Sequence, residues 1–115
     1  MKNLKVVKVD SDEIVFDNGF KLSSYHDQEC CEHHYLHMAD LTLDDFEGLE
    51  FDLSNGNFFN RVPDYGIELI PVKGFPVRIP GYGSNNGYYS DNLYLNLSDN
   101  KGVIIRNYDI SECQF

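Results

Sequence analysis

The sequence lacks several features that would assign it to a well-defined class of protein. It has no tryptophan, and its three cysteines are odd in number, with two of them adjacent at Cys30 and Cys31. Neighbouring cysteines can close only a strained ring, so a disulfide-stabilised scaffold is not expected. Free thiols are typical of a reducing compartment, and we therefore expect a cytoplasmic location.

Long apolar segments are also missing. No apolar run reaches the roughly 18–20 residues of a membrane-spanning helix, so no membrane association is expected. The charged start Met1–Lys5 is not followed by an apolar segment, and we expect no secretory signal peptide. The chain has 115 residues, of which 42% are hydrophobic and 14% aromatic, enough for one core. This size predicts a single domain over residues 1–115.

Basic residues are absent from a long central part of the chain. Between Lys21 and Arg61 there is no lysine or arginine, and nine acidic residues give this stretch a charge of −9 out of a net −10. Such a charge disfavours direct binding of nucleic acid, because the phosphate backbone is itself negative. It favours a cation or a basic protein as a partner at residues 27–52. A surface that serves only to improve solubility is the alternative.

Strand patterns and turn residues dominate the N-terminal part of the sequence. Residues 4–9, 14–16 and 20–25 have the composition of strands. Asn18-Gly19 supplies the positive φ angles of a type I′ turn and predicts a hairpin between the second and third of these strands. Residues 43–47 then predict one helical turn.

Further strands are expected along the rest of the chain. Residues 49–53, 67–72 and 75–79 have strand composition, and the prolines in and beside the last two predict positions at sheet edges, namely Pro71, Pro76 and Pro80.

The C-terminal part contains the second hairpin signal. Leu93, Leu95 and Leu97 alternate with polar residues, which predicts a half-buried strand that pairs with residues 103–108 across the turn at 98–102. About eight short strands with little helix predict a mostly β fold, or an α+β fold with little helix. We expect a small antiparallel sheet curled into a barrel or a sandwich.

Histidine and cysteine are concentrated in one short stretch. All four histidines and two of the three cysteines fall within residues 26–37. In a helix, one stripe would hold His26, Cys30, His33 and His37. In an extended segment, by contrast, His26, Cys30 and His34 would share one face, and Cys31, His33 and His37 the other.

Imidazole and thiolate groups are the ligands that zinc prefers, so a zinc site is one interpretation of this stretch. Its candidate ligands are His26, Cys30, His33, His34 and His37. No standard zinc-ligand spacing is present in the sequence. The alternative is that the cysteines are small buried hydrophobes and the histidines are ordinary polar groups.

Catalysis is a weaker interpretation of the same residues. His26 is close in sequence to Cys30 and would lower the pKa of its thiol on contact, whereas the surrounding carboxylates would raise that pKa. The sequence contains no phosphate-binding glycine loop, no nucleophile elbow and no triad spacing. We therefore lean against an enzyme and assign no catalytic residue.

A tyrosine-rich segment follows the predicted strand at 75–79. Residues 81–90 combine glycine, serine and asparagine with Tyr82, Tyr88 and Tyr89. Loops of this composition are typical of binding surfaces. The alternative is a long hairpin connection whose tyrosines cover the sheet.

Two strings of the sequence together resemble an uncharacterised family of small bacterial and phage-associated domains. The first is H-x-x-x-C-C-E at residues 26–32, and the second is the S-N-G-Y-Y-S-like string that ends at residue 90, with Asn85-Asn86 in place of one asparagine. The resemblance covers roughly residues 13–98. It implies a setting in phage or mobile elements and no particular activity. It also implies a shared functional cluster of His26, Cys30, Cys31, Glu32, Tyr88, Tyr89 and Ser90.

Three classes of function fit these observations. The first is a small non-enzymatic binding domain that recognises a protein through the acidic segment and the tyrosine-rich loop. The second is a zinc-binding domain, and the third is an acidic inhibitor that mimics nucleic acid. The sequence favours the first class, since the acids beside expected turns are not arranged in the surface rows that a mimic needs.

Overall fold

A computed structural model of the protein describes residues 3–26, 33–54, 56–84 and 92–114. Within these ranges the chain is 48% strand and 7% helical, which confirms the mostly β class. The short 3-10 helices are η1 (Leu43–Phe46) and η2 (Gly56–Phe58). The nine strands are β1 (Val6–Val9), β2 (Glu13–Phe16), β3 (Lys21–Tyr25), β4 (His33–Leu36), β5 (Phe59–Val62), β6 (Gly66–Leu69), β7 (Val77–Ser84), β8 (Tyr94–Ser98) and β9 (Ile104–Asp109).

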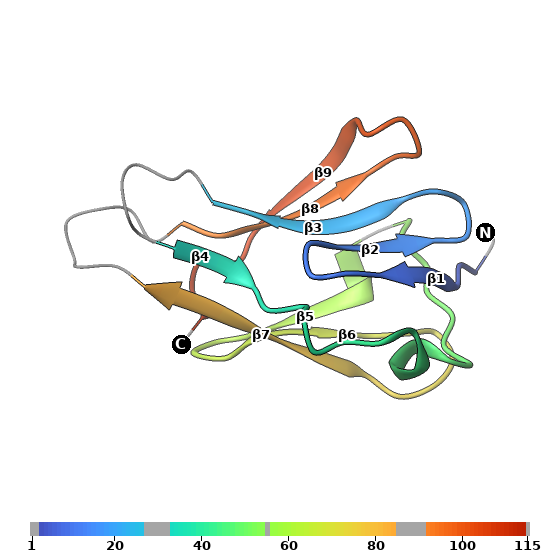
Figure 1. Ribbon diagram of the computed structural model, residues 1–115, viewed down its shortest axis with the longest axis horizontal. Helices are drawn as coiled ribbons and strands as arrows, with labels where there is room; N and C mark the ends of the chain where they lie inside the picture. The colour runs from blue at the N-terminus through green and yellow to red at the C-terminus, as the bar shows by residue number, and fades with distance from the viewer. Residues whose placement is uncertain (1–2, 27–32, 55, 85–91, 115) are drawn as a thin grey trace.

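The strands form two antiparallel sheets that lie in separate layers (Figure 1). The first has the order β1-β2-β3-β8-β9, and the second has the order β4-β7-β6-β5. The architecture is sandwich-like, and the barrel alternative is wrong. Where β3 meets β4, the Leu36 N–H donates to Ser24 Oγ at 3.1 Å, a side-chain bond in place of the ladder that a closed barrel requires.

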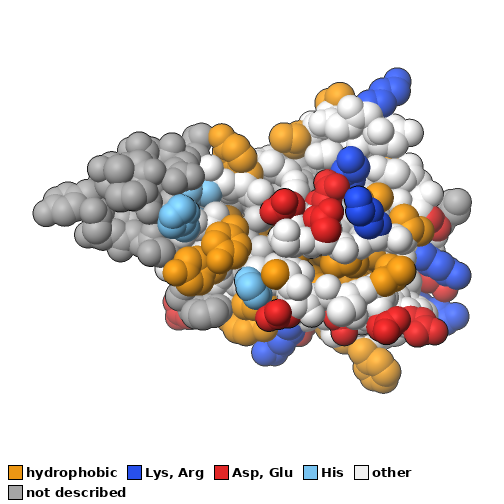
Figure 2. Space-filling model, in the orientation of Figure 1, with side chains coloured by type: hydrophobic (Ala, Val, Ile, Leu, Met, Phe, Trp, Pro, Cys, Tyr) orange, Lys and Arg blue, Asp and Glu red, His pale blue; other side chains and the backbone are white. Residues whose placement is uncertain are grey.

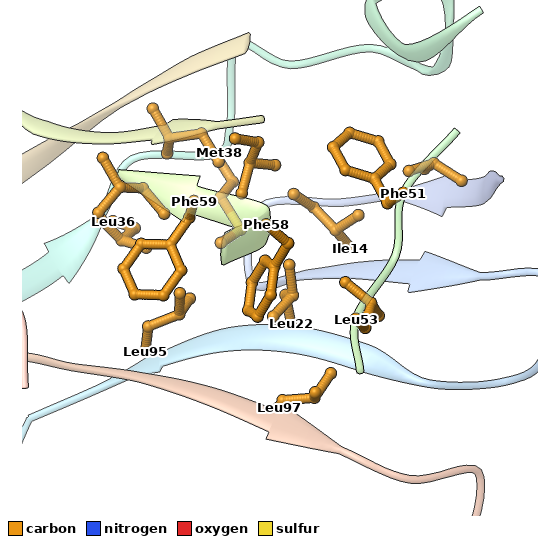
Figure 3. Close-up of a cluster of buried hydrophobic side chains, with 14 of the residues drawn as sticks. Ile14, Leu22, Leu36, Met38, Phe51, Leu53, Phe58, Phe59, Leu95 and Leu97 are labelled. Carbon is orange, nitrogen blue, oxygen red and sulfur yellow. The ribbon is translucent and has the colours of Figure 1, made fainter. Parts of the chain in front are cut away.

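One hydrophobic core lies between the two layers (Figure 3). The burial predicted for Leu93, Leu95 and Leu97 is confirmed, because each of these side chains is fully buried. The predicted alternation is interrupted at Asn96, which is also buried at 6% exposure and accepts a hydrogen bond from the Asn107 side chain. Phenylalanines fill the centre in place of tryptophan; the rings of Phe16 and Phe51, for example, meet edge to face with centroids 5.8 Å apart.

Both predicted hairpins are present, and the turn type predicted for the first is wrong. A type I′ turn has two central residues with positive φ. Here four residues, 17–20, lie between β2 and β3, and of these Gly19 alone has a positive φ, at 88°. The loop is closed by the Phe16 N–H donating to the Phe20 carbonyl at 2.8 Å.

The strand predicted at residues 49–53 does not form a ladder. Phe51 exchanges two backbone hydrogen bonds with Leu4, and Glu50 exchanges two with the Lys73 carbonyl and the Val72 N–H. The segment is extended and has buried side chains at alternate positions. However, its hydrogen bonds form two isolated bridges, one between Phe51 and Leu4 and one between Glu50 and Lys73. Two single bridges to different partners do not make a strand of either sheet.

The expectation that the prolines mark sheet edges is wrong for Pro80. This residue lies in β7, which pairs with β4 on one side and with β6 on the other. The Pro80 carbonyl accepts from the His37 N–H at 2.7 Å, just beyond the end of β4 at Leu36. Pro80, which has no N–H to donate, therefore lies at the end of the β4–β7 ladder. The hydrogen bonds within that ladder are not interrupted by it.

Two further differences concern the second sheet. β5 was not expected, because its burial does not alternate. β7 continues to Ser84, so the first four residues of the expected tyrosine-rich loop belong to a strand. In the part of the chain that is described, no helix has the length and apolarity to cross a membrane.

Candidate functional site

The two strings of the expected functional cluster lie outside the described residues, apart from His26. The residues in question are Cys30, Cys31 and Glu32 in the first string and Tyr88, Tyr89 and Ser90 in the second. The described residues that flank the strings are neighbours, because His33 pairs with Ser84 and Tyr25 pairs with Tyr94. That the strings form one site stays a prediction.

The structure brings two of the four histidines together at this end of the sandwich. His26 follows the last residue of β3, and His34 is the second residue of β4. Their ring centroids are 4.5 Å apart, with the ring planes inclined at 56°. His34 is 6% exposed, whereas His33 beside it is exposed. Residues 33–36 are therefore extended, and the helical stripe does not form there.

Each ring of this histidine pair is held through its Nδ1 atom. His26 Nδ1 lies 2.6 Å from the backbone carbonyl oxygen of Asn92 and 3.1 Å from its side-chain oxygen. His34 Nδ1 bonds to Gln114 Oε1. His34 Nε2 is buried and has no hydrogen-bond partner among the described atoms. A buried polar atom left without a partner costs about 1–3 kcal/mol, so this nitrogen marks a functional candidate.

The other two histidines lie apart from this pair. The ring of His37 is near that of Tyr35, at 6.4 Å between centroids, and its Nε2 is 3.2 Å from the carboxylate of Asp40. Within the described ranges, no three histidine, cysteine, aspartate or glutamate side chains come together as a metal-binding group. Of the five predicted ligands, His33 and His34 point to opposite faces of β4, whereas His26 follows β3 and His37 follows β4.

Two glycines of the expected tyrosine-rich loop make close packing possible here. A Cβ at Gly81 would lie 2.0 Å from the Cys113 carbonyl oxygen, and one at Gly83 would lie 2.2 Å from Gln114 Oε1. The C-terminal residues thus pack directly on β7 and reach His34. Sequence reasoning missed this role, because a Gly-x-Gly pattern between aromatic residues also fits an ordinary loop.

The third cysteine, Cys113, is fully buried and free. Burial raises the pKa of its thiol to about 11, and the neighbouring Glu112 carboxylate adds to the rise. This cysteine therefore stays protonated at neutral pH and has the character of a small core residue, not of a nucleophile.

A cleft with a volume of about 600 Å³ lies between the two sheets where β3 passes β4. One wall is made by the β1–β2 turn and by β3, and it carries the side chains of Asp12, Glu13, Ser23 and Ser24. The other wall is made by residues 35–39. Sequence reasoning did not find this cleft, because its walls come from segments more than ten residues apart with no shared motif.

Tyrosine side chains border the cleft on the β4 side. Tyr35 lines it and stacks on Tyr82 of β7 with centroids 5.1 Å apart. Tyr35 is 41% exposed and Tyr82 is 39% exposed. In Figure 2, hydrophobic side chains lie beside the histidines on this face, with acidic side chains toward the middle of the view.

The acidic segment has two kinds of carboxylate in its described part. Glu50 and Asp52 have structural partners, since Glu50 lies 3.7 Å from Lys73 Nζ and Asp52 accepts from the Ser54 N–H. The remaining acids differ in that they are exposed, although Asp40 is paired with His37 and Asp45 accepts from the Thr42 N–H. They fall within residues 40–47: Asp40, Asp44, Asp45 and Glu47. The exposed negative charge of this segment is therefore concentrated around η1.

Comparisons with known proteins add no assignment to this geometry. No protein-family model, no curated protein and no solved structure matches the chain.

Proposed function

We propose that this protein is a small non-enzymatic binding domain that takes an extended, basic polypeptide segment into the cleft between β3 and β4. The observation that carries the proposal is the cleft itself, about 600 Å³ in volume, with the edge strand β4 on one wall and carboxylates on the other. This volume falls within the range of about 300–1,000 Å³ that is typical of ligand sites.

The strand edge favours an extended partner. In an antiparallel ladder, alternate residues direct their backbone groups to opposite sides. The backbone N–H and C=O groups of Tyr35 point toward β7 in the β4–β7 ladder, so those of Leu36 point toward the cleft. There the Leu36 N–H donates to the Ser24 hydroxyl. An extended segment that replaces the Ser24 hydroxyl as the partner of this N–H would add a strand to the four-stranded sheet, a common mode of peptide recognition.

Charge and aromatic surface favour a basic partner. Asp12 and Glu13 place two carboxylates on the β1–β2 side of the cleft. Lysine or arginine side chains of the partner would pair with these groups. The exposed Tyr35–Tyr82 stack supplies rigid apolar surface on the opposite side, and its ring faces also attract cations.

The chemistry of the cleft supports binding more than catalysis. Ser24 Oγ is engaged by the Leu36 N–H, and His37 Nε2 is paired with Asp40. Among the described residues, no hydrogen bond joins a serine of the cleft to the His37 ring, so no activated nucleophile is assembled. By its resemblance, the domain would act in a phage or mobile-element setting, in the cytoplasm.

The proposal is tested with a short fluorescent peptide that alternates lysine and valine. Fluorescence anisotropy measures its affinity for the protein and for the double variant Asp12→Asn/Glu13→Gln. We expect the variant to bind at least about tenfold more weakly, a loss of roughly 1.4 kcal/mol. A peptide in which glutamate replaces lysine should not bind.

The matched control neutralises two acids outside the cleft. Asp44→Asn/Glu47→Gln changes the net charge by the same amount on η1 and the residue after it. The control should keep most of the affinity. Equal losses in the two double variants would indicate general charge attraction and would contradict a site in the cleft.

A further inference from the structure

We propose that His26 and His34 provide two imidazole ligands of a transition-metal site, of the kind that binds Zn²⁺, at the end of the sandwich where β3 ends and β4 begins. The site is separate from the peptide-binding cleft, and the argument for it does not depend on the proposed function. It depends on which ring nitrogen of each histidine carries hydrogen.

The amide of Gln114 determines the state of His34. Gln114 Nε2 donates to the Ser111 carbonyl at 2.8 Å, and a carbonyl can only accept. Gln114 therefore presents its oxygen, Oε1, to His34 Nδ1. An amide oxygen also only accepts, so Nδ1 carries the hydrogen. In the neutral ring, Nε2 is then the atom with the lone pair.

His34 Nε2 lacks what buried polar atoms nearly always have. The residue is 6% exposed, and this nitrogen has no hydrogen-bond partner among the described atoms. Metal-binding histidines characteristically donate the N–H of one ring nitrogen to an oxygen of the protein, which orients the other nitrogen toward the metal. Gln114 provides that contact for His34.

The Nδ1 atom of the neighbouring His26 is held in a similar way. This nitrogen lies 2.6 Å from the Asn92 carbonyl oxygen, so Nδ1 is again the donor. The two ring centroids are 4.5 Å apart. Two nitrogens bound to one zinc ion lie within about 4 Å of each other, since each Zn–N bond is about 2.0–2.1 Å. We therefore assign the Nε2 atoms of both rings to one ion.

Zinc takes four ligands, and the remaining positions are open to water or to further groups of the chain. The residues with thiol or carboxylate side chains between the two histidines in sequence, Cys30 among them, lie outside the described residues. The proposal concerns the two imidazoles and does not require these groups.

Isothermal titration with Zn²⁺ on the full chain is the test. We expect saturable binding of one equivalent, and a large loss of affinity in His26→Ala and His34→Phe, where the phenyl ring keeps the buried site filled. Gln114→Leu should weaken binding by about 10–100-fold, because it removes the contact that orients the His34 ring. The matched control is His33→Ala, an exposed histidine adjacent in sequence, which should bind as the unmodified protein does.

Nitrogen NMR of the imidazoles keeps the test decisive if His34→Phe fails to fold. On addition of Zn²⁺ to the unmodified protein, the Nε2 resonances of His26 and His34 should shift while their Nδ1 atoms stay protonated. No saturable binding of one equivalent, unshifted Nε2 resonances of both residues, or an equal loss in His33→Ala would overturn the proposal.

Discussion

At the scale of single residues, three aspartates hold turns together through their own side chains. Asp10 accepts hydrogen bonds from the backbone N–H groups of Asp12 and Glu13, and these bonds lower the pKa of its carboxyl. The pKa of Asp52 is lowered by its bonds to Ser54. The pKa of Asp109 is lowered first by the Ser111 hydroxyl and then by the Ser111 N–H.

These aspartates predict a loss of stability in acid. A carboxyl with a lowered pKa in the folded protein stabilises it above the unfolded pKa of 3.8, and this stabilisation is lost as the pH falls through the lower folded value. Asp109→Asn keeps an acceptor and removes the titration. Urea midpoints measured downward from about pH 5 should therefore converge for the variant and the unmodified protein. A difference that stays constant with pH would contradict the role of ionised Asp109.

Cys113 predicts the opposite behaviour in alkali. Its folded pKa is about 11 against 9.0 when solvated, so the unfolded chain loses the thiol proton first. Stability that depends on the neutral thiol is present below about pH 9 and is lost as the pH rises through about 11. The stability advantage of the unmodified protein over Cys113→Ala should therefore shrink above pH 9. Denaturation series on both proteins measure it, and a parallel pH dependence would argue against a buried neutral thiol.

At the scale of elements, the parts that could be predicted from the sequence are those determined by local chemistry. The hairpins at Gly19 and Gly102 follow from turn residues between alternating strands, and both form. The composition of residues 49–53 predicts a strand, and the segment is extended in the structure. It does not join a ladder, because its backbone bridges to two single residues, Leu4 and Lys73, which are far away in sequence. The sequence of the segment itself does not indicate these partners.

The candidate site could be predicted from the sequence only in part, for the same reason. Clustering of histidines in the sequence pointed to residues 26–37. It could not show that His34 is buried against Gln114, which is 80 positions further along the chain. The cleft likewise depends on how the β1–β2 turn meets β4 across the two sheets.

The two hairpin glycines predict different costs of substitution. Gly19 and Gly102 both have a positive φ, 88° and 84°, and alanine costs roughly 1–2 kcal/mol in this conformation. A Cβ at Gly102 would meet nothing within 4 Å, whereas one at Gly19 would lie 2.6 Å from the Asn100 Cβ of the neighbouring hairpin. Gly19→Ala should thus lower the free energy of unfolding by about 1–3 kcal/mol more than Gly102→Ala does. Equal losses in urea unfolding would show that the two hairpin turns are not in contact.

At the scale of the whole molecule, charge is the dominant feature. The net charge of −10 arises almost entirely from the stretch without lysine or arginine, and its exposed acids gather around η1. Like charges repel one another in the compact state and are screened over about 10 Å at 0.1 M salt. The acidic surface and the cleft are thus two distinct sources of attraction for a basic partner.

This excess of negative charge predicts that sodium chloride stabilises the protein. Screening weakens the repulsion among the acids of the folded state, so the melting temperature should rise between low salt and about 0.1–0.2 M. Differential scanning calorimetry at several salt concentrations measures the effect. A melting temperature that falls over this range would mean that attractive ion pairs, such as Arg78–Glu68, outweigh the repulsion.

The most direct test of the binding cleft is a ¹⁵N NMR titration of the protein with the lysine–valine peptide at moderate salt. A partner strand along β4 should shift the amides of Ser24, Leu36 and Met38 most, because these residues line the cleft. The amides of η1 should change little, since the salt screens the exposed acids there. The largest shifts at residues 43–47, or no saturable change at all, would contradict a peptide-binding cleft between β3 and β4.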